Sequence, residues 1–412
     1  MNYGLIGEHL SHSFSKEIHE MCANYTYELC ELTPEAVADF MQNPTFAAIN
    51  VTIPYKQTVM PYLCEIHDHA RRIGAVNTVV NQDGKLYGYN TDFYGMTCLI
   101  EGLKVDITGK KVLILGTGGT SKTATAVVKA LGSGEVLTVS RTKRDGVITY
   151  DEAYESHKDA GVIINTTPLG MFPNNDTQAI DLEGFDKLVC VVDAVYNPLN
   201  TRLVRQAKAK GIKAAGGLYM LVAQALRASE IFIGKKYPEE YLGKLYKKIF
   251  ARKRNIILTG MPSSGKTTVG SILANVFKRD FIDTDWLIED KSGMKISDIF
   301  KKLGEGRFRE LECEAVKEAS RKCGVVIATG GGAVLRPENI DELSSNGTIF
   351  FINRPLSKLM PTEDRPLALD REAIEKRYNE RYDVYCSTAD AVIDADCDPF
   401  TVAERILKEF YK

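Results

Sequence analysis

The second half of the chain contains a glycine-rich run, Gly260-Met261-Pro262-Ser263-Ser264-Gly265-Lys266-Thr267, with the spacing Gly-x-x-x-x-Gly-Lys-Thr. In this pattern the glycines let backbone N–H groups turn toward phosphates, the lysine places a charge on the γ-phosphate, and the threonine hydroxyl binds Mg²⁺. An apolar run at 255–259 predicts the preceding strand, and residues 268–277 predict an amphipathic helix. We therefore expect a P-loop kinase domain that begins at this strand. Its ATP-binding residues would be Gly260, Ser263, Ser264, Gly265, Lys266, Thr267 and Thr268.

Further polar residues follow the phosphate loop in positions where an acceptor could bind. Asp283 and Asp285 are two positions apart, which places both carboxylates on one side of an extended tip. One of them could lie in the Mg²⁺ shell while the other takes a proton from an attacking hydroxyl, although such a pair alone is more often a solvated loop. Arg309 and Glu312 share one face of a predicted helix.

Three consecutive glycines, 330–332, follow a predicted buried strand at 325–328. Glycines at such a place allow a small ligand to approach the backbone closely. Arg365 and Arg381 offer guanidinium groups that suit phosphate and carboxylate. Taken in order, the P-loop, Asp-x-Asp, Phe-Arg-x-x-Glu, Gly-Gly-Gly, Arg-Pro-Leu and Arg-x-x-x-Tyr motifs resemble shikimate kinase.

This resemblance implies roles for individual residues. Shikimate would be held by Asp285, Arg309, Gly331, Gly332 and Arg381. Of these, Arg309 and Arg381 would contact its carboxylate, and Asp285 would orient its 3-hydroxyl and take the proton. It also implies that Thr267 and Asp283 bind Mg²⁺ and that Arg365 lies over the phosphates. Lys358 stands where the family often has an Arg that stacks on the adenine, and Pro399 would lie near the adenine.

The first half contains a second glycine-rich turn, Gly116-Thr117-Gly118-Gly119-Thr120-Ser121, between a strand-like run at 111–115 and a predicted helix of small residues at 123–130. It is close to the dinucleotide fingerprint, with Ser121 in place of the third glycine. The next predicted strand ends in Ser140-Arg141-Thr142-Lys143-Arg144, where an NAD enzyme would carry an acidic residue. Cations and a hydroxyl there suit a 2′-phosphate, so we expect a Rossmann domain that binds NADP. The cofactor residues would be Gly116, Gly118, Gly119, Thr120, Ser121, Ser140, Arg141, Thr142 and Arg144.

Upstream, Lys56 follows a turn-setting proline, Pro54, and Asp92 lies in Asn90-Thr91-Asp92. Reduction of a ketone by hydride needs a proton donor at the carbonyl oxygen. A lysine held in place by a carboxylate can provide it. Either residue alone is more often a surface or capping group.

Several stretches together resemble shikimate dehydrogenase across nearly the whole first 250 residues. They are 12–15, 50–56, 74–78, 90–92, 116–121, 140–142, 165–171 and 217–224. The resemblance implies that Lys56 and Asp92 form the catalytic pair. It also implies substrate contacts from Ser13, Ser15, Thr52, Asn77, Tyr196 and Gln224. Ser15 favours shikimate over quinate.

The elements that must position these residues follow from the alternation of β-branched runs and helix-like stretches. Such alternation predicts an α/β fold with parallel sheets. The runs lie at 111–115, 136–140, 161–165, 188–193, 256–259, 325–328 and 348–353. A chain of 412 residues exceeds one usual core. We expect a substrate domain at 1–103, to which 219–249 returns with a helix at 219–232, then a Rossmann domain at 104–218, a linker at 250–254 and a P-loop domain at 255–412.

Bulk composition excludes several other classes. The net charge of −2 gives no basic field for nucleic acid, and no apolar stretch is long enough for a membrane span. Nine scattered cysteines without a Cys-x-x-Cys pair indicate reduced thiols and a cytoplasmic setting. The sequence does not determine the oligomeric state, and a homo-oligomer is possible.

The resulting hypothesis is a bifunctional enzyme that reduces 3-dehydroshikimate with NADPH and phosphorylates the resulting shikimate with ATP and Mg²⁺. One alternative is a quinate/shikimate dehydrogenase fused to a kinase for another small hydroxy acid. Another is a nucleotide sensor with inactive sites. The acid–base groups of Lys56, Asp92, Lys266 and Asp285 argue against the sensor, which has no use for them.

Overall fold

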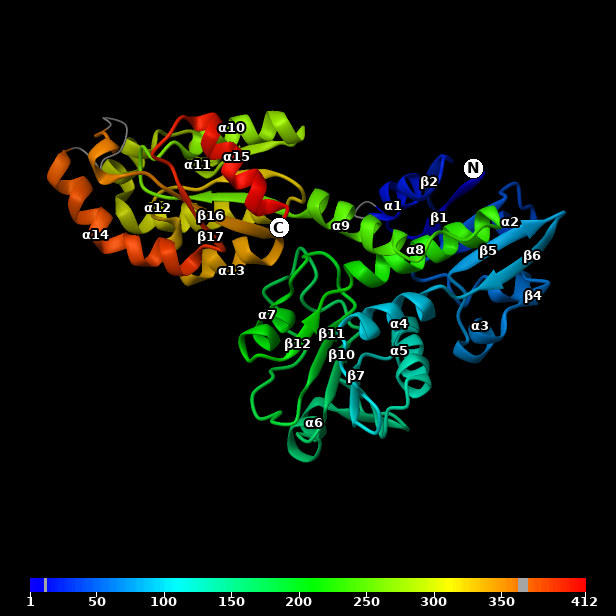
Figure 1. Cartoon of the computed structure of the whole chain (residues 1–412). Coiled ribbons are helices and arrows are strands. Elements are labelled where there is room, and N and C mark those ends of the chain that lie inside the picture. The colour runs from blue at the N-terminus through cyan, green and yellow to red at the C-terminus, as the bar shows by residue number, and fades with distance from the viewer. Residues whose placement is uncertain (11–12, 362–369) are drawn as a thin grey trace. The chain divides into compact units, whose positions relative to one another are not determined.

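The computed structural model describes residues 1–10, 13–361 and 370–412 (Figure 1). The chain divides into two compact units, Met1–Ile249 and Phe250–Lys412. Three β-sheets with helices between their strands confirm the predicted α/β class.

The first sheet of unit 1 is mixed, with the strand order β2-β1-β3-β5-β6-β4. Its strands are β1 (Tyr3–Gly7), β2 (Tyr27–Glu31), β3 (Ala48–Val51), β4 (Glu65–Ile66), β5 (Thr78–Gln82) and β6 (Lys85–Tyr89). The parallel strands β2, β1 and β3 are followed by antiparallel β5 and β6. The short elements around this sheet are α1 (Ser15–Cys22), α2 (Pro34–Gln42), η1 (Met60–Tyr62) and α3 (Asp68–Ile73).

The second sheet of unit 1 is entirely parallel, with the order β12-β11-β10-β7-β8-β9. Its strands are β7 (Val112–Leu115), β8 (Val136–Ser140), β9 (Val147–Thr149), β10 (Val162–Asn165), β11 (Cys190–Asp193) and β12 (Lys213–Ala215). The helices are α4 (Asp92–Gly102), α5 (Gly119–Ala130), α6 (Tyr150–Ser156), α7 (Arg202–Ala209) and α8 (Leu218–Ile233). Because β7 lies between β8 and β10, the connections leave it in both directions, and this reversal is where doubly wound folds bind ligands.

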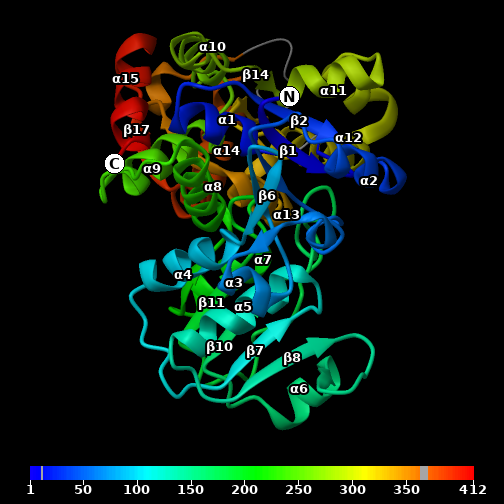
Figure 2. The same ribbon diagram turned by 90° about the vertical axis from the view of Figure 1, so that its right-hand side faces the viewer.

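Helix α4 is shared by the two halves of unit 1. Its buried Met96, Leu99 and Ile100 pack with Val112 of β7 and Val127 of α5 in one core. It also lies against α8, as Figures 1 and 2 both show. The start of α4 is therefore fixed by the core of the parallel sheet.

Unit 2 is built on a five-stranded parallel sheet with the order β14-β15-β13-β16-β17. Its strands are β13 (Asn255–Thr259), β14 (Phe281–Asp283), β15 (Val326–Ala328), β16 (Gly347–Asn353) and β17 (Ala391–Asp394). The α-helices are α10 (Lys266–Phe277), α11 (Thr284–Ser292), α12 (Ile296–Ser320), α13 (Pro337–Asn346), α14 (Arg371–Thr388) and α15 (Pro399–Phe410). Two 3₁₀ turns, η2 (Ala333–Leu335) and η3 (Leu356–Lys358), complete the list.

Helix α9 (Tyr241–Lys253) contains the boundary between the units. It runs through most of the segment expected as a linker, so residues 250–253 are helical. Its last turn is held within unit 2, because Arg279 donates hydrogen bonds to the carbonyl oxygens of Arg254 at 2.8 Å and Ala251 at 2.5 Å. The finer division of unit 1 into a substrate and a Rossmann domain stays a prediction.

The seven predicted strands are confirmed, with ends that differ by at most two residues. The helices predicted at 123–130, 219–232 and 268–277 are also confirmed as parts of α5, α8 and α10. The predictions for these segments are correct because their apolar runs are buried in the cores on either side of the sheets.

Candidate active sites

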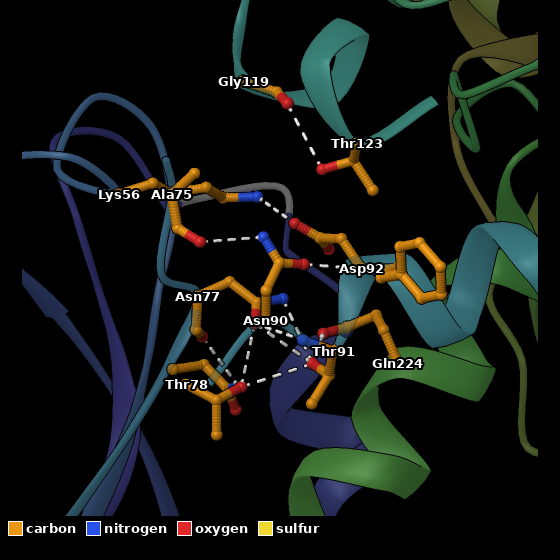
Figure 3. Close-up of polar contacts among 12 residues, drawn as sticks. Lys56, Ala75, Asn77, Thr78, Asn90, Thr91, Asp92, Gly119, Thr123 and Gln224 are labelled. Carbon is orange, nitrogen blue, oxygen red and sulfur yellow. Dashed lines mark hydrogen bonds and ion pairs between the residues drawn. The ribbon is translucent and has the colours of Figure 1, made fainter. Parts of the chain in front are cut away.

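Lys56 and Asp92 form an ion pair in unit 1 (Figure 3). The distance from Lys56 Nζ to Asp92 Oδ2 is 2.5 Å, and the side chains are only 16% and 11% exposed. Asp92 is the first residue of α4, so the core that fixes this helix also fixes the carboxylate. The pair holds an ammonium group ready to donate a proton to a carbonyl oxygen.

Below this pair lies a buried polar network centred on Thr91 (Figure 3). Asn77 accepts a hydrogen bond from the Thr91 amide at 2.7 Å and donates one to its hydroxyl at 3.1 Å. The Thr91 hydroxyl donates to Gln224 Oε1 of α8 at 3.3 Å. Asn77 and Gln224, both predicted to contact substrate, are thus brought together by a residue that the sequence did not single out.

Asn50 is a second residue of this network that sequence reasoning missed. Its amide donates to the Asn77 carbonyl and to Thr78 Oγ1, both at 3.1 Å, and it accepts from the buried Tyr27 hydroxyl at 2.7 Å. Its place at the end of β3, in the same stretch as Thr52 and Lys56, was the available signal.

The remaining predicted substrate residues lie just after strands or at the start of α1. Ser13 Oγ accepts from the amide of Ser15, the first residue of α1, at 3.2 Å. Between them, the Phe14 ring lies 5.2 Å from the Tyr196 ring, which joins this segment to the loop after β11. Thr52 directly follows β3, and its amide donates to the Ile6 carbonyl at 2.9 Å. His12 of the same predicted stretch lies outside the described residues.

The loop that carries Tyr196 is held by Asp193, a buried carboxyl at the end of β11. Asp193 accepts hydrogen bonds from Asn165 Nδ2 at 2.9 Å, the Val195 amide at 3.0 Å and Thr201 Oγ1 at 2.6 Å. Burial raises the pKa of Asp193 to about 6, against the lowering effect of these donors. Sequence reasoning did not single out Asp193, because its bond to Asn165 depends on the pairing of β10 with β11.

The glycine-rich turn of unit 1 joins β7 to α5. Gly116 has φ of 107°, and a Cβ there would lie 2.9 Å from Thr166 Oγ1, so glycine is required. At Gly118 and Gly119 an added Cβ would meet no heavy atom of the described residues within 4 Å. Thr120 and Ser121 occupy the first turn of α5. An open turn at the start of a twelve-residue helix fits a dinucleotide pyrophosphate.

The predicted 2′-phosphate residues follow β8 at the surface. Arg141, Thr142 and Arg144 are exposed, and the Thr142 amide donates to Ser140 Oγ at 3.4 Å. Lys143 instead pairs with Glu152. Lys143 is also exposed, but Arg141 and Arg144 are the cations of this turn that form no ion pair in the described residues, which fits an anionic cofactor.

The P-loop of unit 2 lies between β13 and α10, as predicted. Lys266 is 5% exposed, and its Nζ donates to the carbonyls of Gly260 and Met261, each at 2.9 Å. Gly260 and Gly265 have φ of 144° and 94°. Ser263 donates to the Met360 carbonyl at 2.9 Å, Ser264 is buried, and the exposed Thr268 lies in the first turn of α10.

The predicted extended tip at Asp283 and Asp285 is wrong. Asp283 is the N-cap of α11 and accepts from the Asp285 amide at 3.0 Å, so Asp285 lies in the first helical turn. An aspartate that can satisfy a free amide starts a helix, which explains the difference. Thr267 Oγ1 donates to Asp283 Oδ2 at 2.8 Å. A hydroxyl and a carboxylate side by side fit Mg²⁺, which takes hard oxygen ligands.

A pocket of about 420 Å³ lies beside these groups in unit 2. It contains every residue that the sequence predicted for the acceptor. Those residues are Asp285, Arg309, Gly331, Gly332 and Arg381. The rest of the lining is Pro262, Trp286, Glu289, Lys295, Ile296, Ser297, Phe300, Phe308, Glu312, Gly330 and Arg377.

Arg309 is positioned in the pocket by two carboxylates of its own helix. It pairs with Glu312 at 2.8 Å and Glu305 at 3.0 Å. Glu312 is fully buried; burial raises its pKa, and the charge of Arg309 opposes this. Arg381 donates to the Gly331 carbonyl at 3.1 Å. The sequence predicted the shared face of Arg309 and Glu312 but not that Glu312 lines the pocket.

Two predicted nucleotide residues lie elsewhere in unit 2. Lys358 ends η3 and pairs with Asp396, and Pro399 is the first residue of α15. Arg365 falls outside the described residues. Across residues 1–10, 13–361 and 370–412, no group of three or more His, Cys, Asp or Glu could hold a metal ion. In the same residues, no helix has the length and apolarity needed to cross a membrane.

Comparisons with known proteins relate both units to known families. Residues 5–79 match the family model of the shikimate dehydrogenase substrate binding domain. A shikimate dehydrogenase (NADP(+)) from Clostridium perfringens strain SM101 is 36% identical over 268 residues, which are 61% of this chain and 98% of that protein. This chain belongs to the shikimate dehydrogenase family. Residues 262–411 match the shikimate kinase family model, so the chain also carries a shikimate kinase domain.

Solved structures extend the match over the first unit. Shikimate dehydrogenase 1 from Peptoclostridium difficile has a TM-score of 0.56 and 33% identity, covering 60% of this chain and 98% of that one. The Thermus thermophilus enzyme in complex with NADP(H) and shikimate has a TM-score of 0.54 and 27% identity, covering 60% and 99%. The predicted fusion is confirmed, and the chain is a bifunctional shikimate-pathway enzyme with shikimate dehydrogenase (NADP⁺) and shikimate kinase activities. We call Met1–Ile249 the dehydrogenase unit and Phe250–Lys412 the kinase unit.

Proposed function

We propose that the dehydrogenase unit reduces 3-dehydroshikimate to shikimate with NADPH, and that the kinase unit phosphorylates the 3-hydroxyl of shikimate with ATP and Mg²⁺. The observation that carries the proposal is the pocket of the kinase unit. Residues from four separate segments, chosen from the sequence for a small hydroxy acid, line one cavity there. The ligands of the Thermus thermophilus complex support shikimate and NADPH for the other unit.

In the dehydrogenase unit, bound NADPH supplies the hydride to the carbonyl carbon. The chain's own part is to hold the ketone and to deliver a proton. Lys56 donates that proton to the carbonyl oxygen, and Asp92 keeps the ammonium group in place through the contact of 2.5 Å. Asn77 and Gln224, fixed by Thr91, orient the hydroxyls of the substrate.

Arg141 and Arg144 contact the 2′-phosphate of NADPH, and their exposure after β8 leaves them accessible to it. Gly116, Gly118 and Gly119, with the start of α5, hold the pyrophosphate.

In the kinase unit, ATP with Mg²⁺ supplies the phosphoryl group. Thr267 and Asp283 hold the metal, and Lys266 leaves its loop carbonyls to contact the γ-phosphate. Asp285 takes the proton of the attacking hydroxyl, while Arg309 and Arg381 bind the carboxylate of shikimate. Arg365 is assigned to the phosphates by the family resemblance.

The test is a coupled assay of the intact chain with 3-dehydroshikimate, NADPH, ATP and Mg²⁺, with detection of the phosphorylated product. Lys56→Met should lower reduction by about 10²–10⁴-fold and leave phosphorylation of added shikimate intact. Lys266→Met should abolish phosphorylation of shikimate and leave the reduction of 3-dehydroshikimate intact. Each variant is the folding control for the other. Undiminished phosphorylation by Lys266→Met would overturn the kinase assignment, and faster turnover of quinate than shikimate would overturn the dehydrogenase substrate.

A further inference from the structure

Helix α14 presents two arginines to the acceptor pocket. Arg377 and Arg381 are four residues apart, so they lie on the same face of the helix. Both line the pocket together with Arg309 of α12. Three guanidinium groups from two helices therefore converge on one cavity, although the proposed function uses only two.

The charges that line the pocket do not cancel. The cations are Lys295, Arg309, Arg377 and Arg381, and the anions are Asp285, Glu289 and Glu312. Ion pairs join Lys295 to Glu289 at 2.7 Å and Arg309 to Glu312 at 2.8 Å. Arg309 also pairs with Glu305 at 3.0 Å, so Arg377 and Arg381 are the pocket guanidinium groups left to take up the negative charge of a ligand.

Arg377 and Arg381 are the two pocket cations that form no ion pair with a carboxylate of the described residues, whereas Lys295 and Arg309 are paired. Arg377 Nη1 donates to the Ala373 carbonyl of its own helix at 3.2 Å. Burial lowers the pKa of Arg377, and the charge of Arg381 lowers it further. Glu380 and Glu305 oppose this effect from a distance.

Two like charges at i and i+4 on one helix face repel each other. An anion bound between Arg377 and Arg381 would remove that repulsion and replace it with attraction. The carboxylate of a small hydroxy acid is such an anion, and guanidinium groups match its planar geometry.

We propose that Arg377 is a further substrate-binding residue, which contacts the carboxylate of the kinase acceptor together with Arg309 and Arg381 and restricts the acceptor to small monocarboxylic acids. This inference rests on the proposed phosphorylation of shikimate.

The experiment compares Arg377→Leu with Lys376→Leu. Lys376 is the exposed neighbour on the same helix, so the control makes the same change in net charge outside the pocket. Trp286, the chain's single tryptophan, lines the pocket, so its fluorescence reports binding there. Each variant of the full chain is titrated with shikimate and with uncharged shikimate methyl ester, and kcat and KM are measured with shikimate.

Arg377→Leu should raise the Kd and KM for shikimate by tenfold or more, as expected for loss of a charged hydrogen bond. The Kd for the methyl ester and for ATP should stay unchanged, and Arg377→Lys should recover part of the loss. A merely structural role would weaken acid and ester alike, and that result would overturn the proposal. So would shikimate binding equal to that of Lys376→Leu.

The two proposals fail in different ways. If the wild-type chain phosphorylates shikimate and Arg377→Leu behaves like the control, only the role of Arg377 is refuted. If the wild-type chain does not phosphorylate shikimate, both the proposed function and the proposed role of Arg377 are refuted.

Discussion

Asp193 offers a quantitative test of how the loop bearing Tyr196 is held. The change is Asp193→Asn, which keeps the shape of the side chain and removes its ability to ionise. The amide oxygen can still accept from Asn165 and the Val195 amide, and the amide nitrogen can donate to the Thr201 hydroxyl. Asp193→Asn therefore keeps the hydrogen bonds of this network and removes the negative charge that the carboxyl can carry.

The expected change in the free energy of unfolding follows from the pKa of Asp193, which burial raises from 3.8 to about 6. Because the folded state holds this proton more tightly than the unfolded chain, the group's contribution to stability is complete below pH 4. It is lost as the pH rises through 6. At about 1.4 kcal/mol per pH unit, the loss amounts to about 3 kcal/mol in the dehydrogenase unit.

The assay is urea unfolding of the full chain between pH 4 and 7. Circular dichroism follows both units, whereas the fluorescence of Trp286 follows the kinase unit alone, so the dehydrogenase transition can be separated. The stability of Asp193→Asn relative to wild type should rise by about 2 kcal/mol from pH 4 to 7, since part of the full effect already lies below pH 4. The exposed Asp186 of the same unit supplies the control, and Asp186→Asn should follow the wild-type profile.

A constant difference between Asp193→Asn and wild type across this pH range would refute the reasoning. It would mean that the carboxyl ionises in the folded unit as easily as in the unfolded chain. A variant that unfolds at every pH would instead show that Thr201 and Asn165 require a carboxylate partner, which would also contradict the neutral network described above.

Two further predictions concern the kinase unit. In Gly332→Ala the new Cβ would lie 2.0 Å from Arg309 Nη1, so the guanidinium must move, and KM for shikimate should rise at least tenfold. Gly306→Ala is its control, because a Cβ there would meet no heavy atom of the described residues within 4 Å apart from its chain neighbours and its own helix backbone. Equal KM values in the two variants would contradict the placement of Arg309. Arg279→Met removes the hydrogen bonds to the last turn of α9 and should destabilise the kinase unit by about 1–3 kcal/mol, seen as earlier loss of Trp286 fluorescence in urea. An unchanged urea midpoint would show that these hydrogen bonds do not stabilise the kinase unit.

The parts of both sites that the sequence predicted are those with a local signature. The two glycine-rich turns follow apolar strands and precede helices, so their chemistry could be read from spacing. The strands themselves were predictable because β-branched runs are buried on both faces of a parallel sheet. The error at Asp283 was also local, since an aspartate two residues before a free amide is a helix cap.

The residues that were missed have partners far away in the chain. Thr91 bonds Gln224 across 133 positions, and Asn50 bonds Thr78 across 28. Asp193 and Glu312 are polar groups enclosed by the fold. The apolar run before Asp193 predicted a strand, but the groups that surround both carboxyls come from other segments.

The sequence by itself determined the α/β class, the two phosphate-binding turns and the residue types suited to proton transfer, because these depend on short-range patterns. Only the tertiary structure decided which other groups meet: Thr91 with Asn77, Asn165 with Asp193, and Arg377 with two other arginines at one pocket. The physical reason is that the charge and burial of a site come from segments that the packing of helices on sheets brings together.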